Sequence, residues 1–392
     1  MAIDNKDKKV LNVPHLRFPE FSGEWNKYTI NDLATVVGGG TPDTTVKSYW
    51  GGDIQWFTPS EIGKNKYVDF SKRTITRDGL DNSSAKLLPL HTILLSSRAT
   101  VGECSIASNE CTTNQGFQSL IAKQCNIDFL YYLIQTKKKD LIRNACGSTF
   151  LEISANEIRK IKVAVPVQNE QEQIAKLLSL IDERIATQNK IIEDLKRLKC
   201  AIIEKLYSEI QGEEYSYGQL FKVINERNKQ MEYSNILSAS QEKGMVNRED
   251  LNLDIQFEHN NISTYKIVRE GDYVIHLRSF QGGFAFSDKL GICSPAYTIL
   301  RPNRLLEFGY LSHYFMSHRF IKSLIIVTYG IRDGRSINVE EWLNMKIVIP
   351  SKGHQFHILK VLRSIEGKIK NEEAYATCLS NQKQYLLQQM FI

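Results

Sequence analysis

The sequence predicts a mixed α+β (α/β) fold: two globular domains separated by an antiparallel two-helix coiled coil and related by a pseudo-two-fold internal repeat. The first observation is the repeat itself, because Pro166 lies over Pro350, 184 residues later, and the flanking residues agree at the same offset. The matching pairs are Glu157-Ile158 with Glu341-Trp342, Ile161-Lys162-Val163 with Met345-Lys346-Ile347, and Leu206-Tyr207 with Met390-Phe391. This period is too long for a solenoid and indicates duplication of a whole domain with its helix.

The second observation is a pair of long helical stretches with the alternating four- and three-residue spacing of a coiled-coil seam. We expect the first helix from about Glu170 to Ser208, and its repeat at the end of the chain. The alternative is two amphipathic helices, each buried on its own domain. The apolar seam residues are Ile174, Leu178, Ile181, Ile185, Ile192, Leu195, Ile202 and Leu206 in the first helix, and Ile358, Leu362, Ile365, Ile369, Leu379, Leu386 and Met390 in the second.

Polar residues interrupt each seam at equivalent places, Gln188 and Lys199 in the first helix and Glu372 and Lys383 in the second. Antiparallel pairing of Lys199 with Glu372 also brings Gln188 opposite Lys383. Other registers place a charged side chain against Ile or Leu, which is costly without a partner. We therefore predict this register, with the alternative that the long side chains extend to water at the seam edge.

The third observation is a mixture of short apolar runs and turn residues in both globular parts. Helical segments are expected at 129–139 and 310–319, between the strands. The expected strands are Thr92 to Ser96, Ser119 to Ala122, Ile161 to Val165, Tyr273 to Leu277 and Ile347 to Ile349.

Composition excludes several classes of protein. The net charge of +6 is only mildly basic, so any DNA contact must depend on local clusters. The seven cysteines form no Cys-x-x-Cys pair, which argues against disulfides and zinc. The polar start lacks the apolar core of a signal peptide, and no apolar run is long enough to span a bilayer. We expect a cytoplasmic protein that has no membrane contact.

Motifs for catalysis are missing from the sequence. It contains no phosphate-binding Gly-x-x-x-x-Gly-Lys-Ser/Thr loop, no Pro-Pro dipeptide of an adenine methyltransferase motif and no His-Glu-x-x-His. We therefore expect no catalytic residues, no cofactor and no metal site. His313 and His318 are expected on a surface helix in contact with solvent.

Several motifs together resemble those of Type I restriction–modification specificity subunits. The first half carries them densely, whereas the second keeps only the outline and lacks the Gly-Gly-Thr-Pro loop. The motifs are residues 12–21 with Glu24-Trp25, Gly39-Gly40-Thr41-Pro42, Tyr49 to Trp56, Ser97 to Gly102, Thr113 to Phe117, Pro166 to Ile185, and, in the second half, Leu277 to Gly282 and Ser294 to Tyr297.

The resemblance implies a non-catalytic subunit that reads a bipartite, asymmetric site in double-stranded DNA. It also implies partners: two copies of a modification (methyltransferase) subunit and a restriction (translocase/endonuclease) subunit. The implied organisation is an N-terminal arm (1–24), a first target-recognition domain (25–166), a first spacer helix (167–211), a second target-recognition domain (212–350) and a second spacer helix (351–392).

Candidate DNA contacts follow from this function. Arg98 and Arg278 occupy equivalent places after a predicted strand, where a guanidinium can bind a phosphate or a guanine edge, or pair with its own surface. Asn114 and Gln115 can pair with adenine or stabilise a turn. The other candidates are Thr41, Ser60, Lys64, Lys66 and Ser97 in the first domain, and Gln281, Arg332 and Arg335 in the second.

Two alternatives remain open at this point. An enzyme that carries its own recognition domains is disfavoured by the missing methyltransferase and phosphate-loop motifs. The other alternative is a stand-alone coiled-coil scaffold, or a DNA-binding adapter without restriction partners. Cofactor binding and DNA mobility shift distinguish these alternatives.

Overall fold

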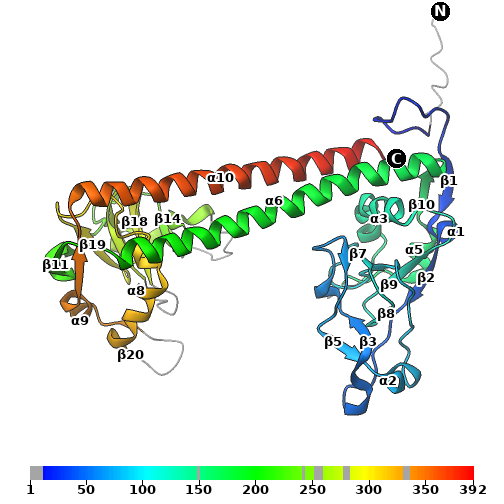
Figure 1. Ribbon diagram of the computed structural model, residues 1–392, viewed down its shortest axis with the longest axis horizontal. Helices are drawn as coiled ribbons and strands as arrows, with labels where there is room; N and C mark the ends of the chain where they lie inside the picture. Colours follow the sequence, from blue (N-terminus) through cyan, green and yellow to red (C-terminus); the bar gives the residue numbers. More distant parts are fainter. Residues whose placement is uncertain (1–11, 148–150, 241–242, 251–258, 277–282, 330–335) are drawn as a thin grey trace, which may run out of the picture. The chain divides into compact units, whose positions relative to one another are not determined.

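The computed structural model describes residues 12–147, 151–240, 243–250, 259–276, 283–329 and 336–392. The chain divides into two compact units (Figure 1). The first unit comprises Met1–Asn189 with Ala374–Ile392, and the second comprises Lys190–Glu373. Each unit therefore contains part of both long helices, α6 (Gln168–Ser208) and α10 (Lys352–Gln389).

The first unit is built on a five-stranded sheet of order β2-β9-β6-β7-β4 and a three-stranded sheet of order β5-β3-β8. Strands β1 and β10 form a separate antiparallel pair. The strands are β1 (Asn26–Thr29), β2 (Ala34–Gly38), β3 (Trp50–Phe57), β4 (Tyr67–Val68), β5 (Arg73–Ile75), β6 (Ile93–Leu95), β7 (Cys104–Ala107), β8 (Cys111–Thr113), β9 (Gln118–Ala122) and β10 (Lys162–Val165). The helices are α1 (Ile30–Leu33), α2 (Arg77–Asp81), α3 (Ile127–Thr136), α4 (Lys138–Arg143) and α5 (Ala155–Lys160).

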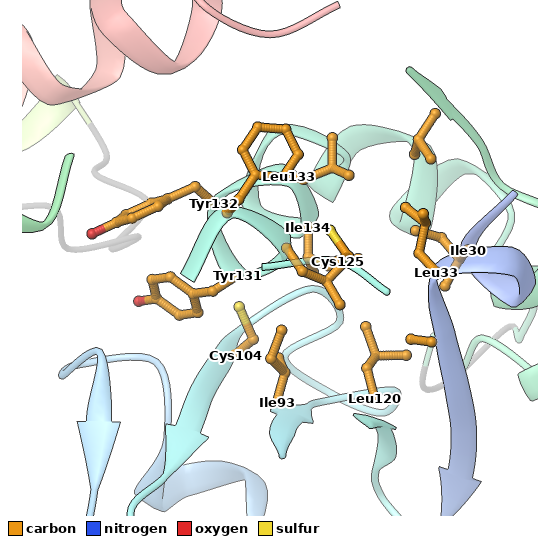
Figure 2. Packing of buried hydrophobic residues seen from close by; sticks show 14 of the residues in the cluster. Ile30, Leu33, Ile93, Cys104, Leu120, Cys125, Tyr131, Tyr132, Leu133 and Ile134 are labelled. Carbon is orange, nitrogen blue, oxygen red and sulfur yellow. The ribbon is translucent and has the colours of Figure 1, made fainter. Parts of the chain in front are cut away.

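Helix α3 supplies much of the first core. Its N-cap is Asn126, whose side-chain oxygen accepts a hydrogen bond from the Phe129 amide at 3.0 Å. Every residue from Phe129 to Ile134 is buried, so the helix is covered on all sides. Figure 2 shows its side chains with Ile93 of β6 and Leu120 of β9, which belong to the same cluster.

The second unit contains a four-stranded sheet of order β12-β19-β16-β17 and four smaller antiparallel pairs, β11-β22, β13-β14, β15-β18 and β20-β21. The strands are β11 (Glu213–Ser216), β12 (Phe221–Ile224), β13 (Leu237–Ser240), β14 (Gly244–Asn247), β15 (Lys266–Val268), β16 (Tyr273–Ile275), β17 (Phe284–Phe286), β18 (Gly291–Cys293), β19 (Thr298–Pro302), β20 (Thr328–Tyr329), β21 (Ser336–Ile337) and β22 (Lys346–Ile349). The helices are α7 (Tyr217–Leu220), α8 (His318–Ser323) and α9 (Val339–Asn344).

Most of the predicted elements are present. The five strand expectations correspond to β6, β9, β10, β16 and β22, and the first long helix ends at Ser208 as predicted. The expected helix over 310–319 is wrong, because this stretch contains turns and a short 3-10 helix, Tyr314–Met316. Helix α8 begins only after Ser317, whose hydroxyl caps it by accepting from the Phe320 amide at 3.2 Å.

The repeat is visible in equivalent buried side chains at the start of each long helix. Gln171 donates to the carbonyl of Pro166 at 2.9 Å, and Gln355, 184 residues later, donates to the carbonyl of Pro350 at 3.0 Å. The oxygen of each side chain accepts a backbone amide of its own unit, from Asn126 at 3.0 Å and Glu307 at 2.8 Å. The two glutamines therefore attach each long helix to the domain it follows.

The seam residues are buried or half-buried in each unit, and ion pairs between the helices show which charged side chains meet. Lys199 binds Glu366 at 2.6 Å in the second unit, and Lys383 binds Asp182 at 2.7 Å in the first. The predicted pairing of Lys199 with Glu372 is wrong, because Glu366 lies six residues, or about 9 Å of helix, from Glu372. Glu372 instead pairs with Lys368 in its own helix.

These two ion pairs are equivalent in the repeat, and each acid has a further partner from its globular part. Asp182 accepts the Tyr132 hydroxyl at 2.7 Å, whereas Glu366 lies 2.9 Å from the His313 imidazole. The hydrogen bond from His313 and the contact with Lys199 lower the pKa of Glu366 to about 2. His313 is therefore a buried partner of the helix, which corrects its expected place in solvent.

Candidate nucleic-acid interface

The structure gathers several of the predicted contact residues at one end of the first unit. Figure 1 shows β3, β5 and α2 at this end, away from α6. The Thr41 hydroxyl donates to the side-chain oxygen of Gln115, so the two predicted residues lie together. Asn114 accepts the Gly116 amide at 2.9 Å, which is the turn-stabilising role that the sequence left open.

We call residues 38–42, 58–61, 71–73 and 113–117 the loop cluster. Its segments are joined by backbone contacts, since the Gly40 amide donates to the Thr113 carbonyl at 2.9 Å. Ser60 is exposed on the short 3-10 helix Pro59–Glu61. The carboxylate of Glu61 accepts the amides of Thr58 at 2.8 Å and Lys72 at 2.6 Å, which attaches this turn to the start of β5.

Gly39 has no room for a side chain in this cluster. A Cβ at this position would lie 2.0 Å from the Asn114 carbonyl oxygen and 2.4 Å from the Thr113 hydroxyl. At Gly38 the nearest atoms, at 3.6 Å, belong to the flexible end of Gln118. The close backbone approach therefore requires glycine at position 39 and tolerates a methyl group at position 38.

Gly39→Ala is therefore expected to destabilise the first unit by about 1–3 kcal/mol, because the backbone of 113–114 must move. The same movement displaces Thr41 from Gln115 and should weaken DNA binding. Gly38→Ala is the matched control and should stay within about 0.5 kcal/mol of wild type. Urea unfolding and a mobility-shift titration of both variants test this, and equal behaviour of the two would contradict it.

Two tryptophans of β3 pack against the loop cluster and contact Arg73, which belongs to it. Trp56 is 4% exposed, and its indole N–H donates to the Gly40 carbonyl at 2.9 Å. Trp50 packs edge-on against Trp56 with ring centroids 5.0 Å apart. The Arg73 guanidinium lies 3.6 Å from the centre of the Trp50 ring. The two tryptophans belong to the motif from Tyr49 to Trp56, but no sequence signal marks Arg73.

Arg98 and Ser97 are engaged within the protein. The Arg98 guanidinium donates to Glu152 at 2.7 and 3.0 Å, which is the surface ion pair that the sequence left as an alternative. Ser97 is fully buried, so its side chain does not reach the surface. Arg98 remains partly exposed, with 44% of its side chain accessible.

Lys64 and Lys66 lie toward α6 and not in the loop cluster. Lys64 is exposed, and both lysines line a cavity of about 860 Å³ beside α6. Lys66 binds Asp128 at 2.7 Å and Ser179 at 2.5 Å, with its side chain only 10% exposed. Its ammonium also lies 4.9 Å from the centre of the Tyr132 ring. Lys66 is thus engaged by partners inside the first unit, and its contact with DNA stays a prediction.

The four candidates of the second globular part, Arg278, Gln281, Arg332 and Arg335, lie outside the described residues. In the described part of the chain, no group of three or more His, Cys, Asp or Glu side chains is arranged to hold a metal ion. Burial raises the pKa of the Cys104, Cys111, Cys125 and Cys293 thiols to about 12, so these thiols are protonated at neutral pH. No described helix combines the length and apolar character needed to cross a membrane.

Residues 22–197 match the family model described as the Type I restriction modification DNA specificity domain. The chain therefore carries a domain of this class. It is 35% identical over 206 residues to the Type I restriction enzyme MjaIX specificity subunit of Methanocaldococcus jannaschii, which covers 50% of this chain and 47% of the relative. It is also 29% identical over 190 residues to the EcoR124I/EcoR124II specificity subunit of Escherichia coli, covering 46% of each. The chain thus spans about half the length of these two relatives.

Other similarities extend over nearly the whole chain. The MjaVIII specificity subunit of M. jannaschii is 24% identical over 407 residues, covering 93% of this chain and 90% of the relative. The Type I system S subunit from M. genitalium has the same fold, with a TM-score of 0.52 at 16% identity over 97% of this chain and 99% of that one. A chain from a structural study of Type I complex assembly has a TM-score of 0.61 at 13% identity, over 93% of this chain and 96% of that one. The family match is therefore to a Type I DNA specificity domain in residues 22–197, and the likeness to the solved structures is one of fold.

Proposed function

We propose that this chain is the DNA-reading subunit of a Type I restriction–modification complex and has no catalytic centre of its own. The observation that carries the proposal is the match of residues 22–197 to a DNA specificity domain. It is supported by the loop cluster, where polar side chains, an exposed arginine and tightly packed glycines meet at one end of that domain. Such loops on a rigid scaffold are common positions for recognition residues.

The proposal extends to the organisation of the chain. Residues 25–166 and 212–350 are two target-recognition domains, each reading one half of a bipartite site. Residues 1–24 form an N-terminal arm, and 167–211 and 351–392 are spacer helices. Because the two domains differ in their polar loops, the two half-sites differ, and the whole site is asymmetric. In the first domain, the proposed DNA contacts within the loop cluster are Thr41, Ser60, Asn114 and Gln115. Two further proposed contacts, Arg98 and Lys64, lie outside this cluster.

The partners proposed here are double-stranded DNA, two copies of a modification subunit and a restriction subunit. The modification subunits would supply the methyl transfer that the chain itself does not perform. The complex would act in the cytoplasm, where it meets the host chromosome and incoming DNA.

Exchange of residues 25–150 for the same region of another family member tests this function. The hybrid, expressed with its modification subunit, is expected to methylate a site in which one half has changed completely and the other is unchanged. Exchange of residues 213–335 is the matched control and should change the other half only. Methylome sequencing reads both halves at once, and a hybrid with both halves altered, or neither, would contradict the proposal.

A further inference from the structure

Arg73 is held in a fixed orientation at the surface of the first unit. It begins β5 and lies directly opposite Trp56 in the antiparallel pairing of β3 with β5. Its guanidinium stacks on Trp50 at 3.6 Å and is 5.4 Å from the centre of the Trp56 ring. A cation on the face of an exposed tryptophan gains about 0.5–1 kcal/mol, so the stacked position is favoured over free rotation.

The backbone beneath this side chain is also held. The Ser71 hydroxyl donates to the Arg73 carbonyl at 2.6 Å, and the neighbouring Lys72 amide is bound to Glu61. Trp50 is itself oriented, because its indole N–H donates to the Asp43 carbonyl at 3.1 Å. The guanidinium therefore projects from a platform whose position is set by β3, β5 and the loop that follows Gly40.

Among the residues that the structure describes, none accepts a hydrogen bond from the Arg73 guanidinium. Arg73 is exposed, and it has no ion-pair partner among the residues that the structure describes. Arg98 differs, because its guanidinium is engaged by Glu152. An arginine whose plane is fixed by stacking while its N–H groups remain free is suited to bidentate binding, which a flexible lysine cannot reproduce.

We infer that Arg73 is a specificity-determining residue that binds the O6 and N7 edge of a guanine in the half-site read by the first domain. The inference rests on the proposed function. A phosphate contact needs only a positive charge nearby, whereas a guanine edge needs two donors in one plane. The stacking on Trp50 supplies that plane, and the adjacent Thr41–Gln115 pair lies on the same loop cluster to read neighbouring positions.

The experiment compares Arg73→Lys and Arg73→Ala with Arg77→Ala in the full chain bound to its modification subunit. Arg77, an exposed residue of α2, is the control, because its loss removes one positive charge from the same region without touching the stack. The affinity for DNA is measured with the recognition site that the complex methylates and with all single-base variants of that site, at two salt concentrations. Arg73→Lys keeps the charge, so it isolates the planar fork from the electrostatic attraction.

Arg73→Lys is expected to weaken binding to the intact site by roughly 5- to 150-fold and to abolish the preference for guanine at one position of the first half-site. Binding to a site already lacking that guanine should change little. Arg77→Ala should weaken binding to all sites by a similar small factor. It should also reduce the slope of log K against log salt concentration by about one. Methylome sequencing of the Arg73→Lys strain should show relaxation at the same single position.

Three outcomes would overturn the inference. The Arg73→Lys complex could retain every base preference, Arg73→Ala could weaken all sequences equally, as a phosphate contact would, or the first half-site could contain no guanine on either strand. In each case the wild-type complex still discriminates a bipartite site, and the proposed function stands. A wild-type complex with no base preference would instead overturn the proposed function itself.

Discussion

Arg17→Met is expected to destabilise the first unit by about 3–5 kcal/mol, because it leaves a buried carboxylate without its counter-ion. The carboxylate belongs to Glu170, whose side chain is 0% exposed at the start of α6. Arg17 binds both of its oxygens at 2.8 Å, and Trp25 adds an indole N–H at 3.3 Å. Arg17 also donates to the Gly23 carbonyl at 2.6 Å, so it attaches the segment before β1 to the helix.

Urea unfolding of the full chain measures this effect, with limited proteolysis to identify the unit that opens first. The matched control is Arg143→Met. Arg143 pairs with Asp140 at the surface, where the two side chains are 76% and 42% exposed. The free energy of unfolding of this variant should therefore stay within about 0.5 kcal/mol of wild type. The double variant Arg17→Met/Glu170→Gln should recover part of the loss, because the buried charge is removed with its partner. If the free energy of unfolding of Arg17→Met lay within 1 kcal/mol of wild type, Glu170 would have found another counter-charge.

The second large effect is expected in the other unit, where Trp342→Ala should cost about 3–5 kcal/mol. Trp342 is 0% exposed and stacks on Tyr217 with centroids 4.3 Å apart, while Phe284 lies at 5.1 Å. The first repeat has Ile158 at the equivalent position, so the two cores have diverged in volume. Removing the indole leaves a cavity that the surrounding rings cannot fill without leaving their rotamers.

Trp342→Phe separates packing from hydrogen bonding in this core. The Trp342 indole nitrogen is buried and has no hydrogen-bond partner among the described residues, so its removal should cost little beyond the lost volume. We expect Trp342→Phe to be clearly less destabilising than Trp342→Ala in urea unfolding. If both variants were equally unstable, the aromatic packing around this residue would not be the source of the stability.

The helices and the repeat could be predicted from the sequence because their signals are local or periodic. Pro166 and Pro350 mark equivalent strand ends, and the four-three spacing from Ile174 and from Ile358 identifies the buried face of each helix. The register of the seam could not be predicted in the same way. Long Lys199 and Lys383 side chains reach acids displaced along the partner helix, so matching polar positions by number alone chose the wrong partner.

The site was only partly predictable. Thr41, Asn114 and Gln115 lie in glycine-rich loops that the sequence marks, and the structure brings them together. Arg73 carries no motif, because its role depends on Trp50, which reaches it only through the pairing of β3 with β5. Cross-strand neighbours of this kind become visible only when the strand pairing is known.

The sequence by itself determined the duplicated architecture, the extent of the first long helix, the seam and the family resemblance, since periodicity and motif spacing are written along the chain. The tertiary structure alone decided which cations are available to a ligand. Arg98 pairs with Glu152, 54 residues away, and Lys66 donates to Ser179, 113 residues away. Arg73 has no such partner in the part of the chain that the structure describes. The electrostatic state of a side chain depends on whichever charge folding places within a few ångströms, and distance along the chain carries no information about that.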